Sequence, residues 1–331
     1  MEFSWISAKR CINIAIVGIC KNAGKTTVLN YIVENYPYKW GILSTGHDGE
    51  TEDTLYKTPK PKVKLPAGCL FCADAKTLVQ QGSGISILAK TKWQSGGREL
   101  WIAKSEIDLE TEITGPANVN GQIACAELFK KLGAAKVLID GSLDRKSIVL
   151  SEAIDGIILA AGASFGSQQA IIDELQRLIT LSQIGTYHSS TLKKLTEQNK
   201  ILIKSQNRWK TTALVSLIAN ETKLLEFINE INNPTHLYIP GAYTSSVNNR
   251  LGKHLKGIQL VFRHPECIKL SNIELEVFLE DHKPLSLIPF KLKAIALNSH
   301  GVGSNEIDAD EFHHNLRSVF NNYPLLDVME I

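Results

Sequence analysis

The sequence predicts an α/β fold in which a mostly parallel sheet is flanked by helices. Short runs of β-branched residues alternate with stretches of helical periodicity, the pattern of parallel strands joined by crossover helices. A glycine-containing loop joins the first of these runs directly to the first helical stretch. The chain has 331 residues, of which 44% are hydrophobic, so it is long enough for two domains.

The first half of the chain supplies the elements of this sheet in order. Residues 12–17 predict the first strand, and a helix with Val28, Leu29, Ile32 and Val33 on one face follows and ends before Pro37. The remaining expected elements are strands at 40–44, 136–139 and 156–160, a helix at 121–132, and a helix that carries Ile171, Ile172, Leu175, Leu178 and Ile179.

An insertion with a different texture interrupts this rhythm. Between residues 59 and 115, prolines and glycines punctuate short alternating runs such as 85–89 and 100–103. We interpret this region as a β-rich insertion within a first domain that covers residues 1–195.

The rest of the chain predicts a smaller C-terminal α/β domain over residues 196–331. The boundary is placed in the polar, lysine-rich segment 186–209. Further strand and helix signals are found at 212–218, 224–231, 236–240 and 258–262, and the chain closes with a strand at 293–298, a helix at 308–321 and a strand at 325–328. Whether this closing βαβ unit joins the first sheet is left open.

Composition limits the expected partners and compartment. Thirty-six basic and thirty-four acidic residues give a net charge of +2, which lacks the electrostatic footprint of a nucleic-acid-binding protein. The first residues lack a secretory signal, and no apolar run approaches the roughly 18 residues that span a membrane. Six scattered cysteines fit a reducing compartment. We therefore expect a cytoplasmic protein with no nucleic-acid or membrane partner.

The segment from Gly18 to Thr27 predicts a P-loop, which binds the phosphates of ATP or GTP together with Mg²⁺. A loop between a buried strand and a helix directs backbone N–H groups and the helix N-terminus at one point. Lys25 would reach the β- and γ-phosphates, and the Thr26 hydroxyl would hold Mg²⁺. The strict pattern has glycine where this chain has Ile19. The expected nucleotide-binding residues are Lys21, Asn22, Ala23, Gly24, Lys25, Thr26 and Thr27.

Two acidic residues complete the expected site. Asp140 ends the apolar run 137–139 and is the Walker B candidate, with a tight Asp-Gly turn as the alternative. Asp48 lies in an acidic loop after the second strand, where it would contact Mg²⁺ and position the attacking nucleophile, unless that loop is only solvated. We therefore assign catalytic roles to Lys25, Asp140 and Asp48, and metal binding to Thr26, Asp140 and Asp48.

Other polar residues keep two interpretations. Lys21 would either neutralise charge in the transition state or point into solvent. Asp144 and Arg145 would form a switch or pair with each other. Cys69 and Cys72 form a lone Cys-x-x-Cys pattern, which falls short of a metal site. No Asn-Lys-x-Asp signature for guanine is present, which leaves the choice between adenine and guanine open.

The order of these motifs resembles the branch of P-loop proteins that includes dethiobiotin synthetase and the accessory protein of molybdopterin-guanine dinucleotide synthesis. The segments 21–27, 46–48 and 138–141 carry that likeness. The chain more narrowly resembles the P-loop subunit of the reactivating factor for lysine 5,6-aminomutase and related ornithine enzymes, which use adenosylcobalamin and pyridoxal phosphate. The segments that carry this second likeness are 48–50, 58–61, 65–68, 139–145, 159–163 and 324–328.

The narrower resemblance implies an ATP-dependent chaperone that exchanges inactivated cobalamin from an aminomutase, together with a second reactivating subunit. On this interpretation the chain is a nucleoside-triphosphate phosphohydrolase. Two alternatives stay open: a small-molecule kinase or ligase of cofactor biosynthesis, with its acceptor site in the insertion, and a nucleotide-gated binding module with little turnover.

Overall fold

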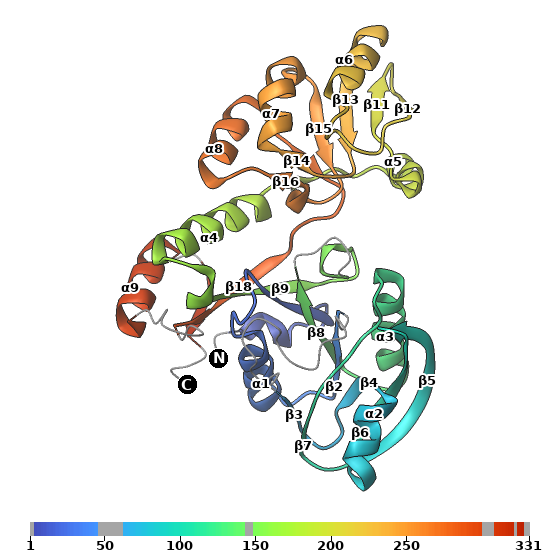
Figure 1. Ribbon diagram of the computed structural model, residues 1–331, viewed down its shortest axis with the longest axis vertical. Helices are drawn as coiled ribbons and strands as arrows, with labels where there is room; N and C mark the ends of the chain where they lie inside the picture. The colour runs from blue at the N-terminus through green and yellow to red at the C-terminus, as the bar shows by residue number, and fades with distance from the viewer. Residues whose placement is uncertain (1–2, 46–61, 143–147, 300–307, 321–322, 328–331) are drawn as a thin grey trace. The chain divides into compact units, whose positions relative to one another are not determined.

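The protein is an α/β protein with a large, mostly parallel sheet flanked by helices and a second mixed α/β sheet (Figure 1). The computed structural model describes residues 3–45, 62–142, 148–299, 308–320 and 323–327. The chain divides into two compact units. Unit 1 comprises Met1–Ile172 with Lys291–Ile331, and unit 2 comprises Asp173–Phe290.

The described residues of unit 1 form one large sheet in the order β19-β18-β9-β1-β8-β2-β4-β6-β5. The strands from β19 to β4 run parallel, whereas β6 and β5 are antiparallel to their neighbours. The strands are β1 (Asn13–Gly18), β2 (Trp40–Ser44), β4 (Leu70–Asp74), β5 (Ile85–Ser95), β6 (Arg98–Ser105), β8 (Lys136–Ser142), β9 (Gly156–Gly162), β18 (Leu292–Asn298) and β19 (Leu325–Asp327).

Apolar side chains on both faces of this sheet explain its near-continuous hydrophobic strands. Helix α1 (Lys25–Asn35) buries Val28, Leu29, Ile32 and Val33 against one face, as its periodicity predicts. Helix α3 (Val119–Lys131) covers part of the other face. There a Cβ added to Gly41 of β2 would lie 2.6 Å from Cγ of Phe129, so only glycine lets the helix pack this closely.

The closing βαβ unit joins the first sheet, which answers the question left open by the sequence. Strand β18 pairs in parallel with β9, and β19 pairs with β18. Helix α9 (Ala309–Val319) connects them. The sequence predicts a boundary at 195/196 between two consecutive segments, whereas unit 1 is assembled from both ends of the chain.

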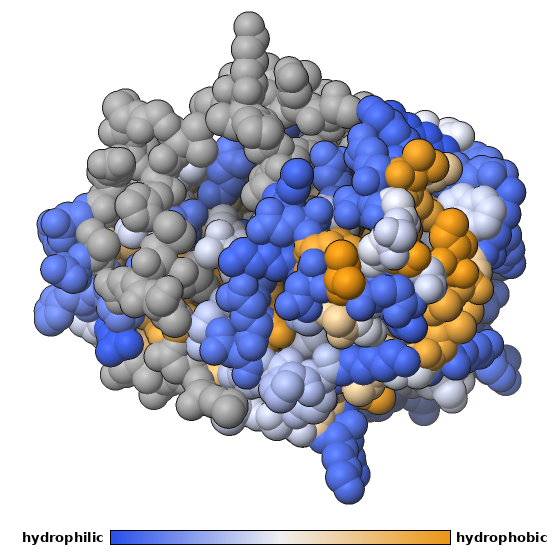
Figure 2. All heavy atoms as spheres, turned by 90° about the horizontal axis from the view of Figure 1, so that it is seen from below, coloured by the Kyte–Doolittle hydropathy of each residue, from blue (hydrophilic) through white to orange (hydrophobic). Residues whose placement is uncertain are grey.

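The insertion extends the large sheet through β4, β6 and β5. The predicted runs 85–89 and 100–103 are parts of the longer antiparallel pair β5 and β6. Helix α2 (Ala75–Gln81) follows β4, and the short strands β3 (Val63–Leu65) and β7 (Leu109–Thr111) pair separately. The exposed large apolar residues of the insertion are Val79, Ile87, Leu88 and Ile107. Figure 2, which views the molecule from below, shows apolar residues gathered toward the right of the view.

The described residues of unit 2 form a second sheet in the order β10-β17-β15-β13-β11-β12, with antiparallel β11 and β12 at one end. Its strands are β10 (Gly185–Thr186), β11 (Leu202–Ser205), β12 (Arg208–Thr211), β13 (Pro234–Ile239), β15 (Gln259–Phe262) and β17 (Leu285–Ser286). Its other elements are α5 (Ser190–Leu195), α6 (Glu221–Glu230), α7 (Ser245–Leu251), α8 (Asn272–Asp281) and the pair β14 (Tyr243–Thr244) and β16 (Ile268–Lys269). Helix α4 (Gln168–Ser182) leads into this unit.

The signals in the second half of the chain correspond to observed elements with one exception. Segments 224–231, 236–240 and 258–262 match α6, β13 and β15. Segment 212–218 forms no regular element. Its first residue, Thr212, is bonded to the start of the β11–β12 hairpin instead, because its hydroxyl donates to the carbonyl oxygen of Ile201. Among the described residues, no helix is both long and apolar enough to cross a membrane.

Candidate functional site

The 18–27 loop leaves β1 and turns into α1 with two residues in the left-handed region. Asn22 has a φ of 58° and Gly24 a φ of 88°. The loop folds back on itself, since a Cβ added to Gly18 would lie 3.3 Å from Cγ of Lys25. The N–H of Ile19 donates to the carbonyl oxygen of Ala160 at 3.0 Å, which fixes the loop to strand β9. The stem of Lys25 therefore lies along the loop.

Helix α1 begins without a side-chain cap. Its N-cap residue is Gly24, which has no side chain to accept a hydrogen bond from the first turn. The first N–H groups of a helix lack intrahelical partners, and the helix dipole adds partial positive charge there. Lys25, Thr26 and Thr27 stand in this first turn and are all partly exposed. The start of α1 thus offers backbone donors, one ammonium group and two hydroxyls to an anion.

The ends of β9 and β18 pack directly against the loop. A Cβ added to Gly162 would stand 3.0 Å from Cα of Ala23, and one added to Gly24 would stand 3.0 Å from Cβ of Asn298. Asn298 is 8% exposed. Sequence reasoning missed Asn298 as a neighbour of the loop, because only the pairing of β18 with β9 brings it there.

Asp140 lies on the strand next to β1, at the same edge of the sheet. It stands opposite Ile16 of β1 and Ser44 of β2, and its carbonyl oxygen accepts the N–H of Thr45 at 2.9 Å. Leu138 belongs to the core on the α1 face, so Asp140, two residues further on, points to that face as well. Its Oδ1 atom is buried. The structure therefore brings Asp140 to the face that carries Lys25 and Thr26.

The remaining predicted residues are placed as follows. Within the loop, Lys21 is exposed, Asn22 is half-buried and Ala23 is buried. Asp48 with its acidic loop, and Asp144 with Arg145, lie outside the described residues.

Cys69, Cys72 and Cys125 are buried, and Cys20 is partly buried. Burial raises the pKa of Cys20 in the loop, against the lowering effect of the Lys25 charge, and burial raises the pKa of Cys69 to about 12. Cys72 shares a side-chain hydrogen bond with Cys125 of α3, which raises the pKa of Cys72 and lowers that of Cys125. Within the described part of the chain, no three His, Cys, Asp or Glu residues are grouped to hold a metal ion.

The chain matches no protein-family model and no curated protein. The structural support for a function is therefore the loop, the uncapped helix and the acidic strand end. These three features lie at the carboxyl edge of a parallel sheet, which is where α/β proteins bind their ligands.

Proposed function

We propose that the protein is a P-loop NTPase, which binds ATP or GTP with Mg²⁺ at the 18–27 loop and hydrolyses it. One observation supports this proposal above the others. Lys25 and Thr26 occupy the uncapped start of α1, and the adjacent strand brings Asp140 to the same face of the sheet. This combination offers donors for phosphate on one side and a carboxylate for a cation on the other.

The residues present fit both groups. Backbone N–H groups and Lys25 suit a polyphosphate. The hydroxyl of Thr26 and the carboxylate of Asp140 are oxygen ligands, which Mg²⁺ prefers. When bound, Mg²⁺ would neutralise charge that develops on the phosphate oxygens. The close packing around Gly18 and Gly24 keeps the loop backbone in one conformation, so the cradle needs little rearrangement when a nucleotide binds.

Hydrolysis, in this proposal, changes the conformation of a partner enzyme. The hydrogen bond from Thr45 to Asp140 joins the chain after β2 to the acidic strand end, so a change at the cation would reach the connection that follows β2. The narrow family resemblance names the partner class as a cobalamin-dependent amino-acid aminomutase, acting with a second reactivating subunit. The small-molecule kinase or ligase and the nucleotide-gated binding module remain the competing functions.

The test is the rate of ATP and GTP hydrolysis by the purified protein with Mg²⁺, with and without the aminomutase, and with Lys25→Ala as the control. We expect the mutase to raise the rate and Lys25→Ala to abolish both basal and stimulated turnover. Lys9→Ala serves as the matched control, since Lys9 is exposed and lies before β1. A phosphorylated small molecule formed in proportion to the nucleotide consumed would instead establish the kinase or ligase.

A further inference from the structure

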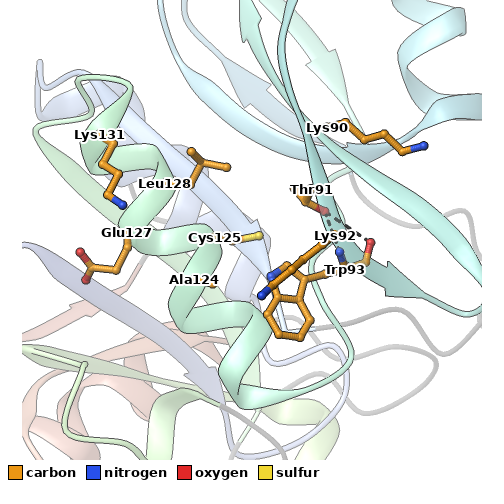
Figure 3. A pocket seen from close by; sticks show the side chains of 9 residues that line it. All are labelled: Lys90, Thr91, Lys92, Trp93, Ala124, Cys125, Glu127, Leu128 and Lys131. Carbon is orange, nitrogen blue, oxygen red and sulfur yellow. Dashed lines mark hydrogen bonds between the residues drawn. The ribbon is translucent and has the colours of Figure 1, made fainter.

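A cavity of about 460 Å³ lies in unit 1 between strand β5 and helix α3 (Figure 3). Pockets of roughly 300–1,000 Å³ are typical of small-molecule sites. Figure 3 shows Cys125 and Leu128 projecting from α3 toward β5, and Trp93 projecting from β5 toward α3, whereas Glu127 points away. The walls that face each other are therefore mainly apolar, with an indole ring on one of them.

A local irregularity in β5 directs Trp93 toward α3. The register between β5 and β6 shifts between Lys90 and Gln94, as in a β-bulge. The hydroxyl of Thr91 fixes this shape: it donates to the carbonyl oxygen of Leu100 at 2.9 Å and accepts the N–H of Trp93 at 3.2 Å. Bulges commonly reorient a side chain near functional sites. Trp93 is thus held in place before any ligand binds.

Helix α3 leaves room for the indole ring at Gly121. A Cβ added there would lie 3.0 Å from Cδ2 of Trp93 and 2.6 Å from Cβ of Pro116. Any larger residue would therefore displace the ring or the chain before α3. The sequence thus places glycine at a helical position that the indole ring covers.

The charged residues around the cavity are predominantly basic. Nζ of Lys92 lies 5.0 Å from the centre of the Trp93 ring, and Lys131 stands at the last turn of α3. Neither lysine forms a salt bridge with a described residue. By contrast, Lys90 pairs with Glu99 at 2.7 Å, and Glu127 pairs with Lys130. Lys92 and Lys131 therefore leave two positive charges available to a ligand.

This cavity is separate from the 18–27 loop. Helix α3 starts at the carboxyl edge of the sheet, where the side chain of Gln122 donates to the carbonyl oxygen of Thr45. The α3 residues that line the cavity run from Ala124 to Lys131, which is about 7 to 18 Å along the helix axis from Val119. A ligand here lies beside the helix and away from the edge at which the loop opens.

We propose that this cavity is a second ligand site, which binds a small organic anion that carries an aromatic ring. The ring packs against Trp93 and Leu128, and the acidic group pairs with Lys92, whose ammonium group lies beside the Trp93 ring. This assignment does not depend on nucleotide binding, because it uses none of the loop residues.

Isothermal titration calorimetry with 1-naphthyl phosphate tests the proposal, with 1-naphthol as the neutral match. The titrations use the full chain and its Lys25→Ala variant, so that phosphate binding by the loop is separated from binding in the cavity. We expect the phosphate ester to bind both proteins equally, and about tenfold more tightly than the alcohol, since charge-assisted hydrogen bonds are the stronger ones. Equal affinity for ester and alcohol would overturn the anionic part of the assignment.

Variants of the lining residues locate the binding. Trp93→Leu should weaken binding roughly tenfold, as expected for the loss of one stacked ring, and Lys92→Gln with Lys131→Gln should weaken it by a similar factor. Lys90→Gln should bind like the unaltered chain, because Lys90 already pairs with Glu99 and points away from the cavity in Figure 3. Binding that survives all of these changes, or that is lost in Lys25→Ala alone, would overturn the proposal. The exposed Lys92 and Lys131 make their double variant independent of any folding defect of Trp93→Leu.

Discussion

The carboxyl edges of the two sheets have the same topology and different chemistry. In unit 1, β1 leads through a loop into α1, whose N-cap is Gly24. In unit 2, β13 leads toward α7 and β15 toward α8, and these helices are capped by the side chains of Thr244 and Ser271. The side chains of Thr244 and Ser271 each accept one N–H of the first turn, from Val247 and Glu274, whereas α1 has no such cap. Parallel strand, loop and helix thus provide the same local scaffold in both units. The N-cap residue decides whether a side chain of the protein accepts an N–H of the first turn or whether that N–H stays open to a ligand.

Several polar groups at the edge of unit 2 are paired with one another. The carboxylate of Glu274 accepts the N–H of Ser271 and the hydroxyl of Ser245, and these hydrogen bonds lower its pKa. Nδ1 of buried His264 accepts the N–H of Glu266 at 3.0 Å. Such closed networks hold the backbone in place but offer no donors to a phosphate. These paired groups of unit 2 are structural contacts, whereas the proposed function assigns the groups of the 18–27 loop to phosphate binding.

The largest expected effect concerns the buried ion pairs of unit 2. Arg177 binds Glu174 at 2.8 Å and Glu266 at 3.2 Å, and Lys269 pairs with Glu266 from the exposed side. Arg177→Met would leave the buried Glu266 with only one partner, and we expect a loss of about 3 kcal/mol in the free energy of unfolding. Urea unfolding measures it, with Arg250→Met as the control, because that guanidinium is largely exposed beside Glu221. Nucleotide affinity should stay unchanged. A loss of affinity in this variant would contradict the assignment of nucleotide binding to the edge of unit 1 alone.

At the edge of unit 1 the corresponding change should affect turnover instead of stability. Asp140→Asn keeps the size of the side chain and removes the charge that would hold Mg²⁺. We expect a fall of about 100-fold in the Mg²⁺-dependent hydrolysis rate, in the range measured for a single electrostatic group in an active site. Nucleotide affinity in the absence of Mg²⁺, measured by equilibrium dialysis, should be unaffected. A full hydrolysis rate in this variant would remove Asp140 from the site.

The sequence predicted the strands and the helix at the first edge, because their signals are local. The four apolar residues that predict α1 are the ones that it buries, and the predicted strand 40–44 is β2 (Trp40–Ser44). The phosphate-loop pattern follows the first predicted strand and Asp140 follows the apolar run 137–139, so their common edge follows from parallel pairing; in the structure Asp140 is part of β8. What remained hidden depends on contacts distant in the chain: Asn298 reaches the loop only because β18 pairs with β9.

The cavity beside α3 was hidden for a different reason. Trp93 lies between the predicted runs 85–89 and 100–103, where the sequence indicates no element, and a bulge beside the hydroxyl of Thr91 turns it toward α3. Gly121 stands at the start of the predicted helix 121–132, and nothing local in the sequence indicates that an indole ring lies over it. Neither side-chain contact has a periodic signal, so only the three-dimensional structure reveals the site.

The next prediction uses the pH dependence of unit 2. Burial, followed by the charges of Lys269 and Arg263, lowers the pKa of His264 to about 3 from 6.5. As pH falls through 6.5, His264 becomes protonated in the unfolded chain but stays neutral in the folded chain. Its contribution to the free energy of unfolding is therefore complete above pH 6.5 and is lost as pH falls toward 3. We expect a loss of about 2 kcal/mol between pH 7 and pH 5. Urea unfolding at several pH values should show it, and His264→Gln should flatten the curve; an equally steep curve in that variant would contradict the assignment.

The smallest expected effect separates capping from ligand binding. Ser271→Ala removes the hydroxyl that accepts the N–H of Glu274 at the start of α8, which should cost about 1 kcal/mol in the free energy of unfolding. Gly24→Asp should instead weaken nucleotide binding: Gly24 has a φ of 88°, which a residue with a side chain adopts only with strain, and the added carboxylate would lie against Asn298 beside the first turn of α1 and repel phosphate. Paired measurements of urea unfolding and nucleotide affinity distinguish the two positions. If Ser271→Ala weakened nucleotide binding as much as Gly24→Asp, helix capping would not explain the difference between the two edges.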